Sequence, residues 1–465
     1  MGGERRIGMS ASVGRSRLAK RDWTHGSIIG NLWALAWPTV ITSTLGIIGP
    51  AIDMVWIGRL GTAQVAGVGV AGIVVTVVQS LVTGLFMGTS AMVARFVGAR
   101  DEETANRAAQ QAFVIGLAFS LLMALVGLFL AARILAVLGV DQAVITQGAA
   151  YMRILLVGMV TISAVTVAQS IMQASGDAMT PMRIAITYRV LHLALCPSLV
   201  FGLWIFPKLG VNGAAYSNVI SQAVGGALGM WVLFSGRTRL RVTLRKFRPD
   251  WQLIWRAARI GIPASLTNME RSFADLILVR LISPFGTLPV AAHSLMQRID
   301  VFAQMPGGGL GTAAGVLAGQ NLGAGQPGRA ARTGWLSAGL ATGISVLLSV
   351  VIWFWADQLF RIFTPSGDLI SVSATFLRIN IAGYVLWGVV VALSMCLNGV
   401  GDTIVPMITN LVTMLGVQLI LAWWLSQHTS LGVYGVRWAA VSGIVVRAVI
   451  YTTYFQRGRW KRTRV

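Results

Sequence analysis

The sequence predicts an all-α polytopic membrane protein with twelve transmembrane helices in two six-helix bundles, related by a parallel internal repeat. Three observations lead to this fold class. Of the 465 residues, 55% are hydrophobic and only 11% are charged, and the mean hydropathy is +0.72, well beyond the usual balance of a soluble globular chain. Several phrases recur at a constant spacing. Basic residues gather in three segments of the chain.

The repeat is visible in one phrase that occurs twice. QASGDAMTPM begins at Gln173 and returns as LNGVGDTIVPM from Leu397, with its aspartates 225 positions apart (402 − 177 = 225). A constant offset over separate phrases indicates that one half of the chain duplicates the other. The same offset relates Pro38 to Pro263, Gly61-Thr62 to Gly286-Thr287 and Gly98-Ala99 to Gly323-Ala324, and LGVNGAAYS from Leu209 returns as LGVYGVRWA from Leu431 at an offset of 222 (431 − 209 = 222).

The membrane spans follow from apolar stretches that exceed the roughly 20 residues a helix needs to cross a bilayer. The stretches 112–132 and 335–355 are examples. We expect each Gly-Asp-x-x-x-Pro-Met phrase to form the turn between spans four and five of its half, where glycine ends one helix and proline suits the first turn of the next. A gating role for Asp177 and Asp402 is the alternative to this capping role. The predicted spans are residues 28–57, 63–93, 108–132, 144–171, 182–206, 212–235, 252–282, 288–318, 333–356, 370–397, 405–426 and 433–455.

The basic segments predict the orientation. With an even number of spans in each half, the N-terminal, middle and C-terminal segments share one side, and the positive-inside rule places that side in the cytoplasm. We therefore expect a multi-pass protein of a bacterial-type inner membrane without a signal peptide. The expected organisation is a cytoplasmic basic tail at 1–27, an N-lobe at 28–235, a cytoplasmic basic linker at 236–251, a C-lobe at 252–455 and a cytoplasmic basic tail at 456–465. The basic residues are Arg5, Arg6, Arg15, Arg17, Lys20 and Arg21, then Arg237, Arg239, Arg241, Arg245, Lys246 and Arg248, then Arg457, Arg459, Lys461, Arg462 and Arg464.

The sequence lacks the motifs of several functional classes. None of the four lysines stands in a Gly-x-x-x-x-Gly-Lys-Ser/Thr phosphate loop, and there is no His-Glu-x-x-His or Gly-x-Ser-x-Gly motif. We expect neither an enzyme nor a cofactor. The net charge of +22 is spread over helix ends, so we expect membrane lipids rather than nucleic acid as partners. Each lobe has enough helices for its own core, which favours a monomer.

Four carboxylates stand inside predicted spans, where a charge is costly and usually serves a purpose. Asp53 has no basic neighbour within one helical turn, so it is a candidate to carry a proton; a position wetted by the outer aqueous phase is the alternative. Glu270, Asp275 and Asp300 could bind a cation. Alternatively, they neutralise the nearby Arg271, Arg298 and Arg280 in static ion pairs.

His192 and Cys196 stand one helical turn apart, on one face of a predicted span. They are a conceivable pair of metal ligands. Two ligands are too few for a zinc site, so we predict no metal site and a packing role for the pair.

Beyond these features, the sequence resembles the MATE family of multidrug and toxic compound extrusion proteins. The resemblance covers about residues 28–455 and rests on AIDMVWIGRLGTAQVAGVG, GIPASLTNMERS, the paired Gly-Asp turns and, most specifically, the string from Ala291 to Ala330. Membership would imply a V-shaped pair of bundles, a central cavity and alternating access. It would also imply antiport of organic cations against H⁺ or Na⁺.

The resemblance also suggests site residues. DinF-like members carry an aspartate that Asp53 matches, and Cys196, His192 and Gln169 occupy positions of their second aspartate and two asparagines. NorM-like members use a glutamate that Glu270 matches with a one-residue shift, but their second acid has no counterpart in 370–397. His192 either shares a proton relay with Asp53 or packs uncharged.

From this resemblance we expect an efflux transporter for organic or amphipathic cations. Ion coupling would involve Asp53, Glu270 and Asp300. The cavity would be lined by Gln169, His192, Cys196, Asp275, Met54 and Met172, of which the methionines would give an adaptable surface. A lipid-linked sugar flippase of the same superfamily, with Arg189, Arg271 and Arg298 facing pyrophosphate, is one alternative. A non-transporting scaffold or receptor is the other.

Overall fold

The computed structural model describes residues 22–243 and 247–463, apart from the side chains of residues 271 and 272. The basic residues predicted at 1–21, Arg245, Lys246, Arg464 and the Arg271 side chain lie outside this part. All regular elements in the described residues are helices. The first half holds α1 (Ile28–Ile57), α2 (Thr62–Gly98), α3 (Glu102–Val137), α4 (Gln142–Val157), α5 (Met159–Ala174), α6 (Met179–Phe201) and α7 (Val211–Ser235). The second half holds α8 (Trp251–Ile282), α9 (Thr287–Gly323), α10 (Pro327–Arg361), α11 (Gly367–Gly399), α12 (Ile404–Thr413), α13 (Leu419–His428) and α14 (Val433–Arg457).

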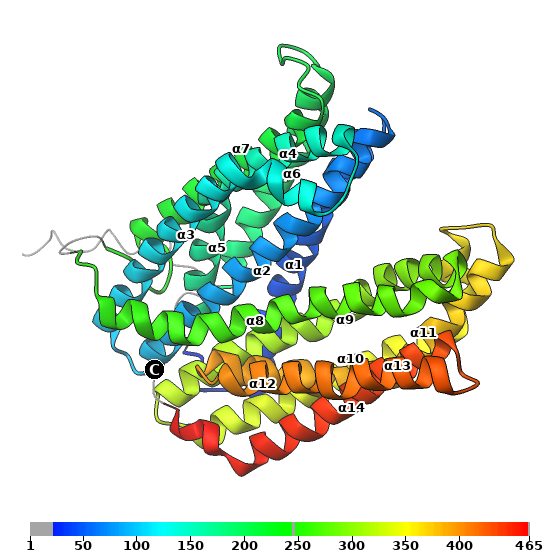
Figure 1. Cartoon of the computed structure of the whole chain (residues 1–465). Coiled ribbons are helices and arrows are strands. Elements are labelled where there is room, and N and C mark those ends of the chain that lie inside the picture. Colours follow the sequence, from blue (N-terminus) through cyan, green and yellow to red (C-terminus); the bar gives the residue numbers. More distant parts are fainter. Residues whose placement is uncertain (1–21, 244–246, 464–465) are drawn as a thin grey trace, which may run out of the picture.

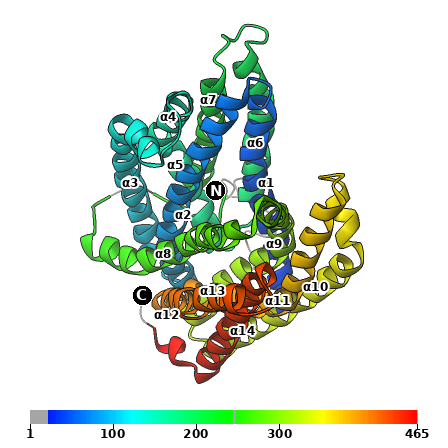
Figure 2. The ribbon, with the colours of Figure 1, turned by 45° about the vertical axis from the view of Figure 1, so that its right-hand side comes forward.

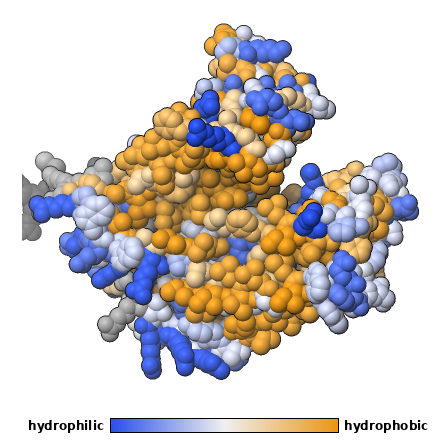
Figure 3. All heavy atoms as spheres, in the orientation of Figure 1, coloured by the Kyte–Doolittle hydropathy of each residue, from blue (hydrophilic) through white to orange (hydrophobic). Residues whose placement is uncertain are grey.

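These helices correspond to the twelve predicted spans. Nine helical segments, with α12 and α13 taken as one, are long and apolar enough to cross a membrane within the described residues, and the bent pair α4–α5 adds a tenth. The other two spans are α8 and α9, where intramembrane charges such as Glu270 and Asp300 lower the hydropathy. Figure 3 shows apolar residues over the flanks of both arms and polar residues at their ends.

Two details differ from the sequence prediction. The fourth span is broken at Gly158, where α4 and α5 meet at a bend of 47°; a β-carbon here would lie 2.4 Å from Val219 of α7, so only glycine allows this approach. The fifth span was predicted to reach residue 206, and this is wrong. Its helix α6 ends at Phe201 because Gly202 adopts a left-handed conformation with φ +73°.

The two halves form the arms of a V (Figure 1), and a view turned by 45° separates the same two groups of helices (Figure 2). The arms meet at the end where the C-terminal segment lies. Glycines allow this meeting: β-carbons at Gly84 and Gly88 of α2 would lie 2.3 Å and 2.2 Å from Ser265 and Ala257 of α8. Close approach at small residues is the usual way in which helices associate inside a membrane.

The first helix of each half begins against the opposite half. α1 packs along α9 as well as along α6, and α8 packs along α2. The contact of Gly309 with Val40 and that of Gly84 with Ser265 are counterparts at the 225 offset (309 − 84 = 225; 265 − 40 = 225). The interface between the lobes is therefore approximately two-fold symmetric within one chain.

The duplicated phrase forms a turn in both halves, as predicted. Gly176 and Gly401 have φ angles of +94° and +90° and follow the helix ends. Asp177 accepts hydrogen bonds from the backbone N–H (3.0 Å) and the hydroxyl (2.7 Å) of Thr180 in the first turn of α6. The aspartate therefore caps the start of this helix. Asp402 likewise accepts from the backbone N–H of Val405, the counterpart of Thr180 (405 − 225 = 180). Its hydroxyl donor is Tyr454, at 2.7 Å, so the two turns differ in the hydroxyl group that their aspartate binds.

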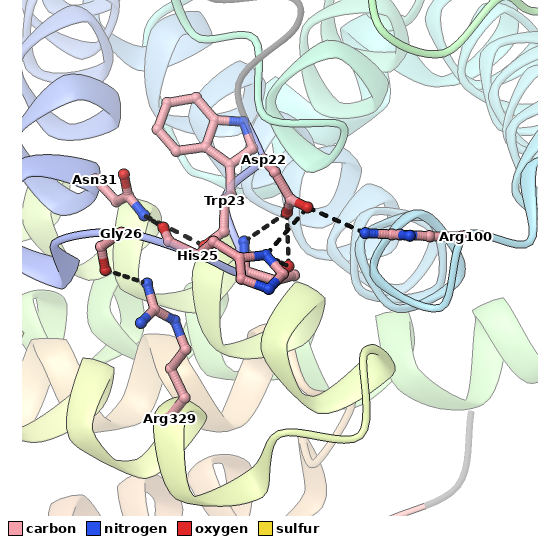
Figure 4. A network of polar contacts seen from close by, with 8 residues as sticks. Asp22, Trp23, His25, Gly26, Asn31, Arg100 and Arg329 are labelled. Carbon is pink, nitrogen blue, oxygen red and sulfur yellow. Dashed lines mark hydrogen bonds and ion pairs between the residues drawn. The ribbon is translucent and has the colours of Figure 1, made fainter.

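Residues 22–27 form a short strap across the ends of both lobes (Figure 4). Trp23 is 1% exposed and lies against Gly176, where a β-carbon would be 2.2 Å from its indole nitrogen. Asp22 accepts from Arg100 at the end of α2 at 3.3 Å, and Arg329 of α10 donates to the Gly26 carbonyl at 2.8 Å. The strap therefore contacts the first lobe on one side and the second lobe on the other.

Candidate functional site

The first half encloses a polar cluster that is built from three helices. Asp53 comes from α1, Tyr151 from α4, and Arg189, His192 and Cys196 from α6. The three α6 residues are spaced by three and four positions, so they share one face of the helix. All five side chains are buried, with exposed fractions from 0% for Cys196 to 8% for Arg189.

Hydrogen bonds join the cluster into a chain. An Arg189 guanidinium nitrogen lies 3.0 Å from His192 Nδ1, His192 Nε2 lies 3.0 Å from Asp53 Oδ1, and the Tyr151 hydroxyl donates to Asp53 Oδ2 at 2.9 Å. The Cys196 thiol lies 3.6 Å from Asp53 Oδ1. Because a guanidinium can only donate, Nδ1 must accept and the ring proton is assigned to Nε2, which donates to Asp53.

This geometry corrects the sequence analysis on Asp53. The carboxylate is 1% exposed, so the outer aqueous phase does not wet it. It is also not unpaired, since His192 and Tyr151 donate to it and the charge of Arg189 stands behind the imidazole. These donors and the nearby guanidinium give the carboxylate charge-assisted hydrogen bonds, and they join the five side chains into one polar network.

Gly49 makes room for this arrangement. A β-carbon at Gly49 of α1 would lie 2.1 Å from a guanidinium nitrogen of Arg189. The same nitrogen lies 3.0 Å from His192 Nδ1, so a side chain at position 49 would push the guanidinium away from the imidazole. The phrase Gly-Pro-Ala-Ile-Asp at 49–53 therefore supplies both the space for the cation and the carboxylate that balances it.

Other predicted cavity residues lie outside this chain of hydrogen bonds. Met172 is fully buried in the apolar core of the first half, and Met54 is 37% exposed. Gln169 of α5 is half-buried, and its amide nitrogen has no hydrogen-bond partner among the described residues.

The second half contains a cavity of about 370 Å³. Its charged lining comprises Glu270, Asp275, Asp300, Arg437 and Arg447, with His293 beside them. The Arg447 guanidinium donates to Glu270 at 2.7 Å. The Tyr384 hydroxyl donates to Asp300 in a short contact, and Asn380 donates to the same carboxylate at 3.5 Å.

The ion pair of Glu270 supports the static-pair alternative for this residue, with a partner that the sequence analysis missed. Arg447 lies on α14, 177 residues from Glu270 (447 − 270 = 177), whereas the expected partner Arg271 is a sequence neighbour. Arg437 of α14, which is 2% exposed, contacts His293 and lies 4.8 Å from the centre of the Phe376 ring. The signal that could have identified both arginines is their position inside an apolar span.

Comparisons with known proteins agree with this architecture. YoeA of Bacillus subtilis, a probable multidrug resistance protein, is 25% identical over 92% of this chain and 93% of its own. NorM of Deinococcus radiodurans, with the same description, is 28% identical over 89% of this chain and 92% of its own. A solved outward-facing multidrug resistance MATE family transporter superposes with a TM-score of 0.89 at 25% identity, over 96% of this chain and 99% of that chain.

A transporter of the MOP superfamily from Pyrococcus furiosus also shares the fold. Its TM-score is 0.89 at 24% identity, over 97% of this chain and 99% of that chain. The MatE family model matches twice, at residues 38–198 and 263–424, and so reproduces the internal repeat. Because the two matches span more than half of the 465 residues, the chain belongs to the MatE family, as its motifs predict.

Proposed function

We propose that this protein is a secondary active efflux transporter that exports organic, amphipathic cations in exchange for protons by alternating access. The observation that carries the proposal is the Asp53 carboxylate, enclosed by three helices and joined to an imidazole and a phenol. The family and its multidrug resistance relatives support the transport class. If the basic segments lie in the cytoplasm, the arms of the V open towards the outside.

The charge of the cluster explains how a proton acts on it. With Asp53 ionised and His192 neutral, the negative carboxylate balances Arg189, so the buried cluster has no net charge. A proton on Asp53 removes that balance and leaves the arginine charge uncompensated in a buried site. A buried charge without its counter-charge is strongly disfavoured, so the proton shifts the conformational equilibrium towards the state in which Arg189 is better compensated.

α1 transmits this change to the lobes. Its first part packs along α9 of the opposite lobe, and its second part carries Asp53 against α6. Pro38 and Pro50 lie within the helix, and each lacks the N–H that would close a helical turn. Protonation of Asp53 therefore weakens the contact between α1 and α6. Because α1 can bend at its two prolines and also packs on the opposite lobe, the two lobes then change their relative position.

The charges of the second cavity favour a cationic substrate. Three carboxylates and two guanidiniums line it among the described residues, which leaves an excess of one negative charge. This balance supports organic cations over the pyrophosphate of a lipid-linked sugar. Because Glu270 is held by Arg447, we propose H⁺ at Asp53 as the coupling ion, with Na⁺ at the Glu270 and Asp300 cavity as the competing possibility.

The apolar core of each lobe is completed by the start of the other half's first helix, so both cores are closed within one chain and we propose that the protein works as a monomer. It would need no cofactor besides the coupling ion, and anionic lipids would contact its basic segments.

A transport assay tests the proposal. The purified protein is reconstituted in sodium-free vesicles, and the movement of a fluorescent cationic dye is followed after a pH gradient is imposed. We expect gradient-driven flux that Asp53→Asn abolishes. Asp141→Asn is the matched control, because it also removes a carboxylate but at an exposed position before α4 without a side-chain cap hydrogen bond, and it should retain flux.

The other outcomes are equally informative. Normal flux in Asp53→Asn would overturn the role of Asp53, and flux that appears only with sodium would identify Na⁺ as the coupling ion. Flipping of a lipid-linked precursor without dye flux would favour the flippase. The absence of any solute or lipid movement would favour a scaffold or receptor.

A further inference from the structure

Three side chains of the buried cluster carry atoms that commonly bind transition metals. Asp53 offers a carboxylate oxygen, His192 offers Nε2 and Cys196 offers a thiolate, and the three atoms lie within 4.8 Å of one another. No other group of three or more such side chains occurs among the described residues. The sequence analysis set the histidine and cysteine aside because two ligands are too few, but the fold adds Asp53 from α1 as a third.

The spacing of these atoms suits a tetrahedral ion. Zinc bonds of about 2.0 Å to oxygen and nitrogen and about 2.3 Å to sulfur imply tetrahedral edges of about 3.3–3.6 Å between ligand atoms. Asp53 Oδ1 lies 3.0 Å from His192 Nε2 and 3.6 Å from Cys196 Sγ. An ion therefore needs an opening of a few tenths of an ångström between the carboxylate and the imidazole, and the Nε2 and Sγ atoms, which lie within 4.8 Å of each other, must come to about 3.5 Å.

We propose that Asp53, His192 and Cys196 form a binding site for a divalent transition metal ion of the Zn²⁺ type. A mixed set of oxygen, nitrogen and sulfur donors suits Zn²⁺ and Co²⁺, whereas Na⁺, Mg²⁺ and Ca²⁺ prefer oxygen ligands alone. Tyr151, which donates to the second carboxylate oxygen at 2.9 Å, would orient the ligand from outside the coordination shell.

Arg189 is the charged group that opposes this ion. It donates to His192 Nδ1, so Nε2 carries the ring proton. A metal on Nε2 moves that proton to Nδ1, and the guanidinium must then turn away. The Cys196 thiol also releases its proton on binding, so one proton leaves per ion bound and binding strengthens as the pH rises. Among the described residues, Arg189 from α6 and Tyr151 from α4 are the other titratable groups that form hydrogen bonds with these ligands.

The position of the site has a consequence that depends on the proposed function. A metal ion on Asp53 occupies the oxygen that the coupling proton would take. Bound metal should therefore stop proton-driven export without touching the substrate cavity of the other lobe. The binding itself does not depend on transport and is measured separately.

Cobalt gives a direct readout, because a thiolate bound to Co²⁺ has a charge-transfer absorption in the near ultraviolet. The test uses the tag-free Cys396→Ser variant in detergent. This substitution leaves Cys196 as the only thiol of the chain. Co²⁺ is added stepwise, and each absorbance is followed to its plateau because the site is buried. We expect a saturable band that excess Zn²⁺ removes.

Two further variants make the result decisive. The double variant Cys196→Ser, Cys396→Ser should lose the band, and Arg189→Gln in the Cys396→Ser background should bind Co²⁺ at least tenfold more tightly. Absence of a band in folded Cys396→Ser protein and in its Arg189→Gln derivative would overturn the site, as would a band that persists without Cys196. Unchanged dye export with the metal bound would overturn the blocking effect alone, and failed export in every sample would count only against the proposed function.

Discussion

Arg95 of α2 donates a hydrogen bond across the lobe interface to the Val400 carbonyl at 3.3 Å. Its counterpart at the 225 offset is Gln320 (320 − 95 = 225), which donates to the Ala174 carbonyl at 2.7 Å. Both carbonyls belong to the duplicated Gly-Asp phrase, so each lobe donates a hydrogen bond to the turn of the other. Gly98 and Gly323 allow this approach, since a β-carbon on either would lie 2.0 Å from the opposite backbone. The phrase that occurs twice in the sequence therefore marks the two halves of one latch.

We expect Gln320→Met to weaken this latch. The substitution keeps the volume but leaves the buried Ala174 carbonyl without its donor, which costs about 1–3 kcal/mol. The readout is maleimide labelling of a cysteine placed at position 90 by Ser90→Cys. Ser90 of α2 and Thr312 of α9 line one small cavity between the lobes, so the labelling rate reports how often this interface opens. Labelling should accelerate in Gln320→Met but not in Gln222→Met, whose amide donates to Asn218 on its own helix α7. Equal labelling in both variants would show that these hydrogen bonds do not hold the two lobes together at the end where the arms meet.

Trp23 should stabilise the folded protein strongly. It is 1% exposed, and replacement of a buried tryptophan by alanine costs about 3–5 kcal/mol. Thermal unfolding in detergent should show a large loss for Trp23→Ala and a small one for Trp33→Ala, whose side chain is 58% exposed. Similar losses for the two variants would mean that the strap adds little to the packing of the lobe ends.

Asp22 predicts a pH dependence of stability. Burial alone would raise its pKa, but hydrogen bonds from Thr24 and His25 hold the pKa well below the ordinary value of 3.8. A carboxyl group with a lowered pKa stabilises the folded state above its unfolded pKa, and this contribution disappears as the pH falls towards the folded pKa. The difference in melting temperature between wild type and Asp22→Asn should therefore be constant above about pH 5 and shrink below about pH 4. A difference that is unchanged at low pH would contradict this role.

The Glu270–Arg447 pair allows static pairing to be separated from ion coupling. Arg447→Leu leaves the carboxylate of Glu270, which is 5% exposed, without this partner, and breaking a buried pair costs about 3–5 kcal/mol. The double variant Glu270→Leu, Arg447→Leu should recover most of that stability. Dye export that also recovers indicates a static pair. Export that stays lost while stability recovers would assign Glu270 a part in ion coupling.

Local sequence patterns predicted the helices and the repeat well. Hydropathy identifies ten of the spans in the described residues, because each presents about 20 apolar residues to the bilayer, whereas the charges of α8 and α9 lower their hydropathy. The bend at Gly158 was missed, since it results from the close approach of Val219 on another helix. Likewise, the end of α6 at Phe201 depends on the left-handed Gly202, which apolar neighbours at 203–206 obscured.

The candidate site was predictable only in part. Asp53, His192 and Cys196 stood out as polar residues inside apolar spans, and the resemblance placed them together. Tyr151 and the role of Arg189 were missed because the contacts of the cluster join residues up to 143 positions apart (196 − 53 = 143), and the packing of α1 on α6 decides them. Asp53 looks unpaired in the sequence because its partners lie on other helices and not along its own.

The first helices of the two lobes have a consequence for how the chain can be divided. α1 starts against the second lobe and α8 starts against the first, where the Asp250 N–H donates to Gln111 of α3 at 3.1 Å. This is the arrangement of a domain-swapped dimer, closed within a single polypeptide. Either half expressed alone would leave the surface that receives its partner's first helix uncovered, and we expect it to aggregate or pair with itself. Co-expression of the two halves should restore the pairing. The product should be a complex that contains one copy of each half.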